Sequence, residues 1–208
     1  MHFESGEAYH IYNRGNEKQP IFFSEKNYLF FLQKVRMEWL PFSDILAYTL
    51  MPNHFHFIIV PNKNGCRNII LKERETHMQE LSKIIGKTLS SYTQAINIEQ
   101  KRTGNLFQKK TKAKCLTDFD ERSINPYLVT SAHYIHNNAY AANLVSSPFQ
   151  WDFSSLKDYA GLRNGTVPSM NQNDLKDIFR SPVWPPVAAW LHSLTEFKFT
   201  SEINISFT

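Results

Sequence analysis

Apolar and polar side chains alternate near the start of the chain, and this alternation predicts a strand. Residues 7–16 read EAYHIYNRGN, in which Tyr9 and Ile11 alternate with His10 and Tyr12. The Asn, Arg and Gly residues that come next are typical of a turn. We therefore expect a strand that ends in a turn within this segment.

Helical spacing replaces the alternation from residue 24 onward. Ser24 is a good N-cap residue, and Pro41 closes the segment at its other end. The apolar residues between them recur at helical spacing: Tyr28, Phe31, Leu32 and Val35. Together these signals predict an amphipathic helix that runs to about Leu40.

Two apolar runs follow, DILAYTLMP at 44–52 and HFHFIIVP at 54–61. Their length and composition predict two adjacent strands, joined by a tight turn at Pro52 and Asn53. The segment 72–101 is predicted as one long amphipathic helix. Its apolar stripe consists of Met78, Leu81, Ile84, Ile85, Leu89 and Tyr92.

The last two predicted elements lie between residues 109 and 139. The run KKTKAKCLT at 109–117 alternates again, which predicts a fourth strand. Residues 123–139 show a helical pattern, and Pro126 is tolerated there because it falls in the first turn. After Ser146 the sequence is rich in turn residues and its periodicity weakens.

The order strand, helix, strand, strand, helix, strand, helix indicates an α+β, ferredoxin-like split βαβ sandwich. We expect a four-stranded antiparallel sheet with helices on one face, plus an extra C-terminal helix. Residues 1–145 are assigned to this domain, and residues 146–208 to a C-terminal extension of irregular structure packed on it. Within that extension, residues 166–208 show no functional signal.

The composition narrows the class of protein. A chain of 208 residues with 42% hydrophobic residues can bury the core of one domain. No segment approaches the roughly 20 apolar residues that a membrane-spanning helix needs. Cys66 and Cys115 have neither the spacing of zinc ligands nor that of a disulfide framework. We therefore expect a cytoplasmic protein that is neither secreted nor membrane-bound.

Positive charge is concentrated in one segment. Residues 101–114 read KRTGNLFQKKTKAK and hold six basic residues and no acidic one, whereas the rest of the chain is slightly acidic. Such a segment is a common electrostatic footprint for a phosphate backbone, although an ordinary solvated surface has the same composition.

Two histidines stand at the start of the run MPNHFHFIIVP. Side chains alternate across a strand, so His54 and His56 share one face and lie about 7 Å apart along it. Two such imidazoles can hold one metal ion or one phosphate. They can equally be structural residues that hydrogen-bond to their neighbours.

A second pair of polar residues lies on the predicted helix at 123–139. Tyr134 and Asn138 are four positions apart and therefore share one helix face. If this face meets the histidines, two imidazoles, an amide oxygen and a phenol gather in one place. Other tyrosines are rival candidates, namely Tyr92, Tyr127 and Tyr140, and Asn138 can alternatively cap the end of the helix.

In combination these motifs resemble the single-tyrosine transposases that carry an HUH motif (His, hydrophobic, His), in the branch associated with repetitive extragenic palindromes. The resemblance covers residues 8–161. It rests on five sequence segments, which are in chain order YHIYNRGN, MPNHFHFIIVP, GNLFQKKTKAK, YIHNN and WDFSSLKDYAG. It implies that residues 1–145 are the catalytic domain of a metal-dependent enzyme that nicks and joins single-stranded DNA near hairpins.

The resemblance also implies roles for individual residues. Tyr134 would be the nucleophile that forms a 5′-phosphotyrosine intermediate. His54, His56 and Asn138 would hold a divalent metal ion, Mg²⁺ or Mn²⁺, and the imidazoles favour Mn²⁺. The expected DNA-binding residues are Arg14, Phe107, Gln108, Lys109, Lys110, Lys112 and Lys114. Among these, Phe107 and Gln108 are expected to stack on or read an unpaired base.

The partner is therefore expected to be single-stranded or hairpin DNA, with no membrane. Monomer and homodimer both stay open. Two other functions also stay open. A ferredoxin-like sheet with basic and aromatic residues can be a non-enzymatic nucleic-acid-binding module. His54 and His56 could instead serve a metal-dependent phosphodiester hydrolase, although no carboxylate general base is evident near them.

Overall fold

A computed structural model describes residues 1–71, 74–116, 126–160 and 162 of the chain. Most of the expected C-terminal extension, from residue 163 on, lies outside the described residues, as does the predicted start of the last long helix at 123–125. Within the described part, no helix is long and apolar enough to cross a membrane.

The main sheet has four antiparallel strands in the order β2-β3-β1-β6. The strands are β1 (Tyr9–Arg14), β2 (Ser43–Met51), β3 (His54–Pro61) and β6 (Lys112–Cys115). The connection from β1 to β2 passes over β3, and the connection from β3 to β6 passes over β1, which is the split βαβ arrangement. The prediction of a mixed α+β fold with a four-stranded antiparallel sheet is confirmed.

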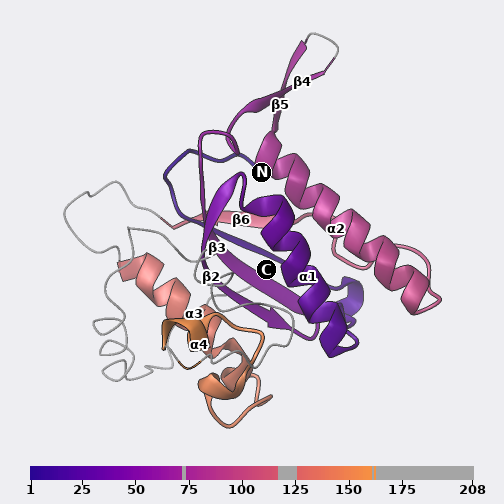
Figure 1. Cartoon of the computed structure of the whole chain (residues 1–208), viewed down its shortest axis with the longest axis vertical. Coiled ribbons are helices and arrows are strands. Elements are labelled where there is room, and N and C mark those ends of the chain that lie inside the picture. The colour runs from indigo at the N-terminus through magenta and orange to yellow at the C-terminus, as the bar shows by residue number, and fades with distance from the viewer. Residues whose placement is uncertain (72–73, 117–125, 161, 163–208) are drawn as a thin grey trace.

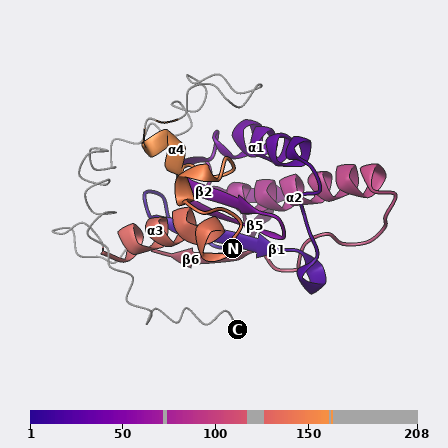
Figure 2. The same cartoon turned by 90° about the horizontal axis from the view of Figure 1, so that it is seen from below.

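Two long helices cover one face of this sheet. Both views show α1 (Glu25–Trp39) and α2 (Glu80–Glu99) side by side (Figure 1 and Figure 2). Ser24 caps α1 as predicted, in a capping box with Asn27. The largest buried side chains of this layer come from both helices and the sheet, and include Phe31, Trp39, Tyr92, Phe55 and Phe57.

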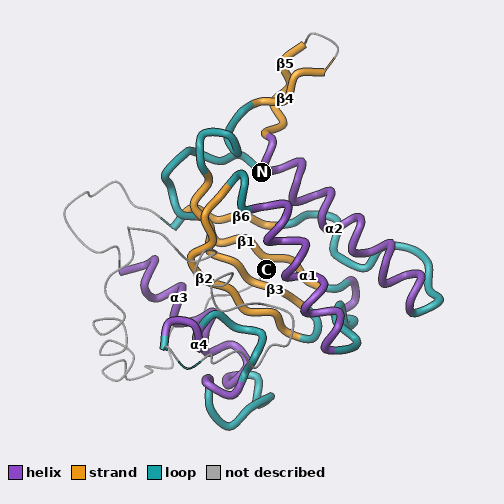
Figure 3. Tube along the Cα trace, in the orientation of Figure 1, coloured by secondary structure: helices purple, strands orange, loops and turns teal. Residues whose placement is uncertain are grey.

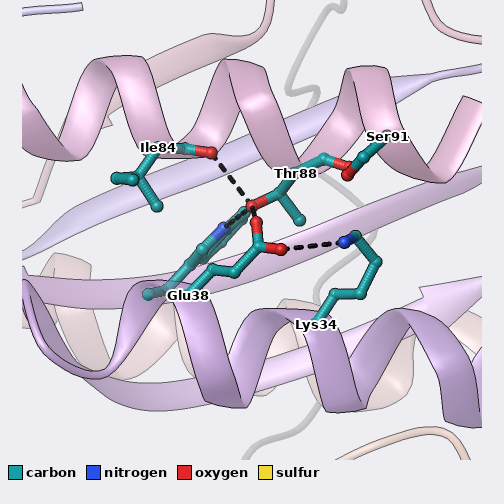
Figure 4. A network of polar contacts seen from close by, with 6 residues as sticks. Lys34, Glu38, Ile84, Thr88 and Ser91 are labelled. Atoms are coloured by element: carbon teal, nitrogen blue, oxygen red, sulfur yellow. Dashed lines mark hydrogen bonds and ion pairs between the residues drawn. The ribbon is translucent and has the colours of Figure 1, made fainter.

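A polar network lies between these two helices (Figure 4). Thr88 of α2 donates a hydrogen bond to Glu38 of α1 and accepts one of 3.0 Å from the indole N–H of Trp39. Lys34 binds the other oxygen of Glu38 at 2.8 Å. The network joins the helices through specific contacts in addition to their apolar packing.

The opposite face of the sheet carries α3 (Pro126–Ala141) and the short helix α4 (Leu156–Tyr159). A smaller apolar cluster holds them, formed by Ile58 and Ala47 of the sheet with Ile135 of α3 and with Leu156 and Tyr159 of α4. Two 3-10 turns, at Asn16–Lys18 and Pro148–Gln150, complete the described helices. The predicted last helix is thus present, and it lies on the face away from α1 and α2.

The prediction of one helix over 72–101 is wrong in its first part. Residues Asn68–Leu71 (β4) and Arg74–Gln79 (β5) form a separate two-stranded hairpin, and the helix begins only at Glu80. Figure 3 shows this hairpin standing apart from the main sheet. Consequently Met78 belongs to a strand and its side chain is 53% exposed. The β-branched residues of this segment, such as Ile69 and Thr76, favour the extended conformation.

Candidate functional site

A cavity of about 340 Å³ opens at the end of β3 where His54 and His56 lie. β3 begins directly after the turn at Pro52 and Asn53, so the two histidines are its first and third residues. Both line the cavity, and their ring centroids are 5.0 Å apart with the ring planes nearly perpendicular. The alternation of the strand therefore places both imidazoles on one face, as predicted.

Each histidine has a polar partner at its Nδ1 atom. Nδ1 of His54 lies 2.6 Å from Oδ1 of Asn53, in the preceding turn. Nδ1 of His56 lies 2.9 Å from Nε2 of His10, which comes from the neighbouring strand β1. In both residues Nδ1 is thus engaged with the protein, so a ligand in the cavity would have to bind at the second ring nitrogen, Nε2.

Burial keeps both imidazoles in the neutral form at pH 7. It lowers the pKa of His56 far below its usual range, and the neighbouring rings of His10 and His54 lower it further. Burial also lowers the pKa of His54, an effect that a hydrogen bond with the Asn138 side chain opposes and the charge of Arg14 reinforces. Neutral imidazole is the form that binds metal ions.

Tyr134 and Asn138 line the same cavity from the other side. They are four residues apart on α3, and the smaller apolar cluster holds this helix against the sheet. The centroid of the Tyr134 ring lies 5.8 Å from that of His56, with the planes nearly perpendicular. The structure thus brings together the four residues that the sequence singled out on two separate elements.

The environment of Tyr134 keeps its hydroxyl protonated near neutral pH. Burial raises the pKa of the phenol, the Asn138 side chain opposes this shift, and the nearby Tyr12 adds to it. In Asn138, the Nδ2 atom is buried and has no hydrogen-bond partner among the described residues. This unpaired N–H group can donate a hydrogen bond to an acceptor atom of a ligand in the cavity.

The three rival tyrosines lie elsewhere. Tyr92 is a core residue that donates a hydrogen bond of 2.8 Å to the carbonyl oxygen of Ile21. The ring of Tyr127 lies beneath the ammonium group of Lys114, and Tyr140 is 47% exposed on α3. A fourth tyrosine, Tyr12 of β1, also lines the cavity, and no sequence pattern singled it out.

Four basic residues border the cavity, and its described lining contains no acidic side chain. Arg14, Lys110 and Lys112 are among the predicted DNA-binding residues. Lys18 was not predicted. It follows Gly15 in the turn after β1, where a Cβ at Gly15 would lie 2.1 Å from the carbonyl oxygen of Gln19. A side chain at position 15 would collide with this oxygen, so the turn requires glycine there. The turn lies beside the cavity, because Lys18 is part of the lining.

Two of the predicted lysines, Lys109 and Lys114, lie outside the lining of the cavity. Lys109 is an exposed residue of the loop before β6, because this strand begins only at Lys112. Lys114 is in β6, but its ammonium group lies 4.8 Å from the centroid of the Tyr127 ring. That contact directs Lys114 toward the start of α3.

The prediction that Phe107 stacks on an unpaired base is contradicted by its burial. Phe107 is only 6% exposed, and its ring packs among those of Phe31, Phe55 and Tyr92 in the larger apolar cluster. The neighbouring residue, Gln108, does line the cavity. Its backbone N–H donates to the carbonyl oxygen of Arg14 at 2.9 Å, which continues the pairing of this segment with β1.

The contact between His10 and His56 was also missed by sequence reasoning. The two residues are 46 positions apart, and only the register of β1 on β3, in which Tyr12 pairs with His56, brings His10 close. Within the described residues, no group of three or more His, Cys, Asp and Glu side chains is placed to hold a metal ion. The ligand set on offer is therefore two imidazoles and one amide.

No protein-family model and no curated protein sequence matches the chain. Among solved structures, the chain is similar to a REP-associated tyrosine transposase bound to a REP hairpin. The TM-score is 0.56, the sequence identity is 14%, and the alignment covers 78% of this chain and 86% of that one. The chain therefore shares its fold with a tyrosine transposase.

Proposed function

We propose that this chain is a DNA nicking and joining enzyme of the tyrosine transposase type, acting on single-stranded DNA that carries a hairpin. The observation that carries the proposal is one shared cavity. Tyr134 reaches it from α3, His54 and His56 reach it from β3, and four cations border it. The shared fold with a transposase bound to a REP hairpin supports the same conclusion.

Tyr134 is the proposed nucleophile. Its hydroxyl oxygen attacks the phosphorus of a phosphodiester, a bond from that oxygen to phosphorus forms, and the bond from phosphorus to the 3′-oxygen breaks. The proton lost by the phenol reaches the departing 3′-oxygen, which leaves as a hydroxyl. One phosphodiester replaces another, so little free energy is lost and a second DNA end can reverse the step. No nucleotide cofactor is required for this chemistry.

The residues at the cavity fit a divalent metal ion as an incomplete ligand set. His54 and His56 offer neutral imidazoles, and Asn138 offers the oxygen of its side-chain amide, since its unpaired Nδ2 atom is a donor that does not bind a cation. Such a set leaves positions for substrate oxygens, and both Mg²⁺ and Mn²⁺ are proposed, with imidazole favouring Mn²⁺. When bound, the ion supplies positive charge to a non-bridging phosphate oxygen.

The cations around the cavity are proposed to bind the DNA backbone. Arg14, Lys18, Lys110 and Lys112 surround the tyrosine with positive charge. Phosphate contacts of this kind fix the position of the strand without reading its sequence. Gln108 lies among these cations and has the amide group needed to hydrogen-bond to an exposed base edge.

Transfer of labelled DNA to the protein tests the proposal. Single-stranded hairpin DNA from the flanks of the gene, labelled at its 3′ end, is incubated with protein and Mn²⁺ or Mg²⁺ and separated on a denaturing gel. Wild-type protein should take up the label only with metal, and Tyr134→Phe should take up none. Tyr140→Phe is the matched control, because this tyrosine is exposed on the same helix, and it should behave as wild type.

Other outcomes would favour other functions. An adduct that survives in Tyr134→Phe and disappears in Tyr12→Phe would assign the nucleophile to the second tyrosine of the cavity. DNA binding without any adduct in the wild type would reduce the function to a nucleic-acid-binding module. Multiple turnover that survives in both Phe variants would indicate a hydrolase that uses an activated water.

A further inference from the structure

Two buried imidazoles meet behind the cavity. Nε2 of His10 and Nδ1 of His56 are 2.9 Å apart, and the residues are 8% and 3% exposed. Their rings are tilted by 31° with centroids 5.0 Å apart. The described lining of the cavity includes His56 and does not include His10. His10 is therefore placed to act on its neighbour and not on a substrate.

A hydrogen bond between two neutral imidazoles has one proton, and there are two ways to place it. If His10 donates from Nε2, then His56 accepts at Nδ1 and carries its own proton on Nε2. If His56 donates from Nδ1, then its Nε2 atom has a lone pair. Only the second arrangement leaves His56 able to bind a metal ion through Nε2.

The adjacent His54 shows which arrangement matches the site. Its Nδ1 atom lies 2.6 Å from Oδ1 of Asn53, and the orientation of that amide is fixed because its Nδ2 atom donates to the carbonyl oxygen of Lys18 at 3.3 Å. His54 therefore has its proton on Nδ1 and a lone pair on Nε2. The same tautomer in His56 gives the cavity two equivalent imidazole donors.

We propose that His10 is a positioning residue, which accepts the Nδ1 proton of His56 and so holds the Nε2 lone pair of that ring ready for a metal ion. The role of the pair in metal binding rests on the proposed function, whereas the tautomer can be measured without metal or DNA. Mutation of a residue that fixes the tautomer of a ligating histidine commonly lowers metal affinity by about 10–100-fold. We expect a loss of about this size when His10 is replaced.

The tautomer is measured by nitrogen-15 NMR of histidine in the protein without metal. We expect His56 to have its proton on Nδ1 in the wild type, and His10→Phe to introduce the Nε2–H form. The variant His10→Gln keeps an acceptor oxygen and should preserve the wild-type tautomer. A wild-type His56 with its proton on Nε2 would overturn the proposal, and this measurement needs no substitution and so does not depend on whether a variant folds.

Manganese binding provides a second readout, measured by the electron paramagnetic resonance signal of free Mn²⁺. His10→Phe should weaken binding by about 10–100-fold, and His10→Gln should recover most of it. The matched control is His77→Phe, since His77 is exposed on β5 in the separate hairpin. Equal affinity in wild type and His10→Phe would overturn the positioning role.

The two proposals can fail independently. A wild type that shows the expected tautomer and Mn²⁺ binding but forms no DNA adduct would remove the proposed enzymatic function and leave the role of His10 intact. A wild type that forms the adduct while His10→Phe binds Mn²⁺ normally would leave the function intact and remove the role of His10.

Discussion

Nε2 of His136 lies 2.7 Å from Oγ of Ser155, and this contact ties the helix that carries Tyr134 to the segment before α4. Ser155 is also bound to the edge strand β2. The backbone N–H of Tyr48 donates to its hydroxyl oxygen at 2.9 Å, and its own N–H donates to the Tyr48 carbonyl oxygen at 3.0 Å. A single serine thus links α3 to the sheet.

Replacing Ser155 by Ala should loosen this link. The N–H of Tyr48 and the Nε2 atom of His136 would both lose their partner in a buried place, which costs about 1–3 kcal/mol in the free energy of unfolding. Because α3 carries Tyr134, the yield of DNA adduct should fall more than the affinity for DNA. Denaturant unfolding and the labelled-DNA assay measure the two effects. Ser146→Ala, at an exposed serine, should change neither.

The network around Thr88 should contribute to stability in the same way. Thr88→Val keeps the shape of the side chain but leaves the indole N–H of Trp39 without its acceptor and removes a donor from Glu38. We expect a loss of about 1–3 kcal/mol in the free energy of unfolding. Thr93→Val is the control, since among the described residues the Thr93 hydroxyl bonds only the Leu89 carbonyl of its own helix. Equal losses in the two variants would contradict the role of the network.

Glu38 should make the stability of the protein sensitive to acid. Burial opposes its ionisation, but hydrogen bonds from Lys34 and Thr88 outweigh burial and hold the pKa of Glu38 below its ordinary value. The carboxylate therefore stabilises the folded state above the ordinary glutamate pKa of about 4.3, and this contribution is lost as the pH falls through the lower folded value.

Substitution of Glu38 tests this contribution. Unfolding measured from pH 7 to pH 3 should show a shallower acid decline in Glu38→Gln than in wild type. Glu25→Gln, at an exposed position at the start of the same helix, should retain the wild-type decline. A decline in Glu38→Gln as steep as that of wild type would argue against the lowered pKa.

The lysines of the cavity should determine the salt dependence of DNA binding. Each phosphate contact to single-stranded DNA contributes about 0.7 to the slope of log affinity against log salt concentration. Lys110→Gln and Lys112→Gln should each reduce the slope by about that amount, as measured by titration at several salt concentrations. Lys26→Gln, on α1 at the other face of the sheet, should leave it unchanged.

Phe107 should behave as a core residue. Phe107→Ala removes a buried ring from the cluster around Phe31 and Tyr92, and we expect a loss of about 3–5 kcal/mol in the free energy of unfolding. At temperatures where the variant is still folded, its affinity for single-stranded DNA should equal that of the wild type. Weaker binding by a fully folded variant would restore the idea of base stacking.

Local sequence patterns were enough to predict the strands of the main sheet, and to predict which residues of the site share a face within one element. Alternation in β3 fixes the shared face of His54 and His56, and helical spacing fixes the shared face of Tyr134 and Asn138. Both inferences need only the geometry of one element. Whether the two faces meet depends on packing between the elements, which the sequence analysis left as a condition and the structure shows.

The remaining features depend on relationships between elements. The contact of His10 with His56 follows from strand register, and that of His136 with Ser155 follows from packing of the chain along β2. The burial of Phe107 follows from an isolated pairing with Gly15 that turns its ring toward the core. No periodicity within a single segment contains this information.

The sheet separates two apolar layers of unequal size, and α3, the helix that carries Tyr134, belongs to the smaller one. We therefore expect two cooperative units that differ in the free energy of local unfolding. The helices α1 and α2 with the sheet should exchange their amide hydrogens only on global unfolding, whereas α3 can detach by a smaller, local opening. If α3 opens first, the proposed nucleophile Tyr134 would move with it, and a DNA strand would have room to enter and leave without disturbing the histidines on β3.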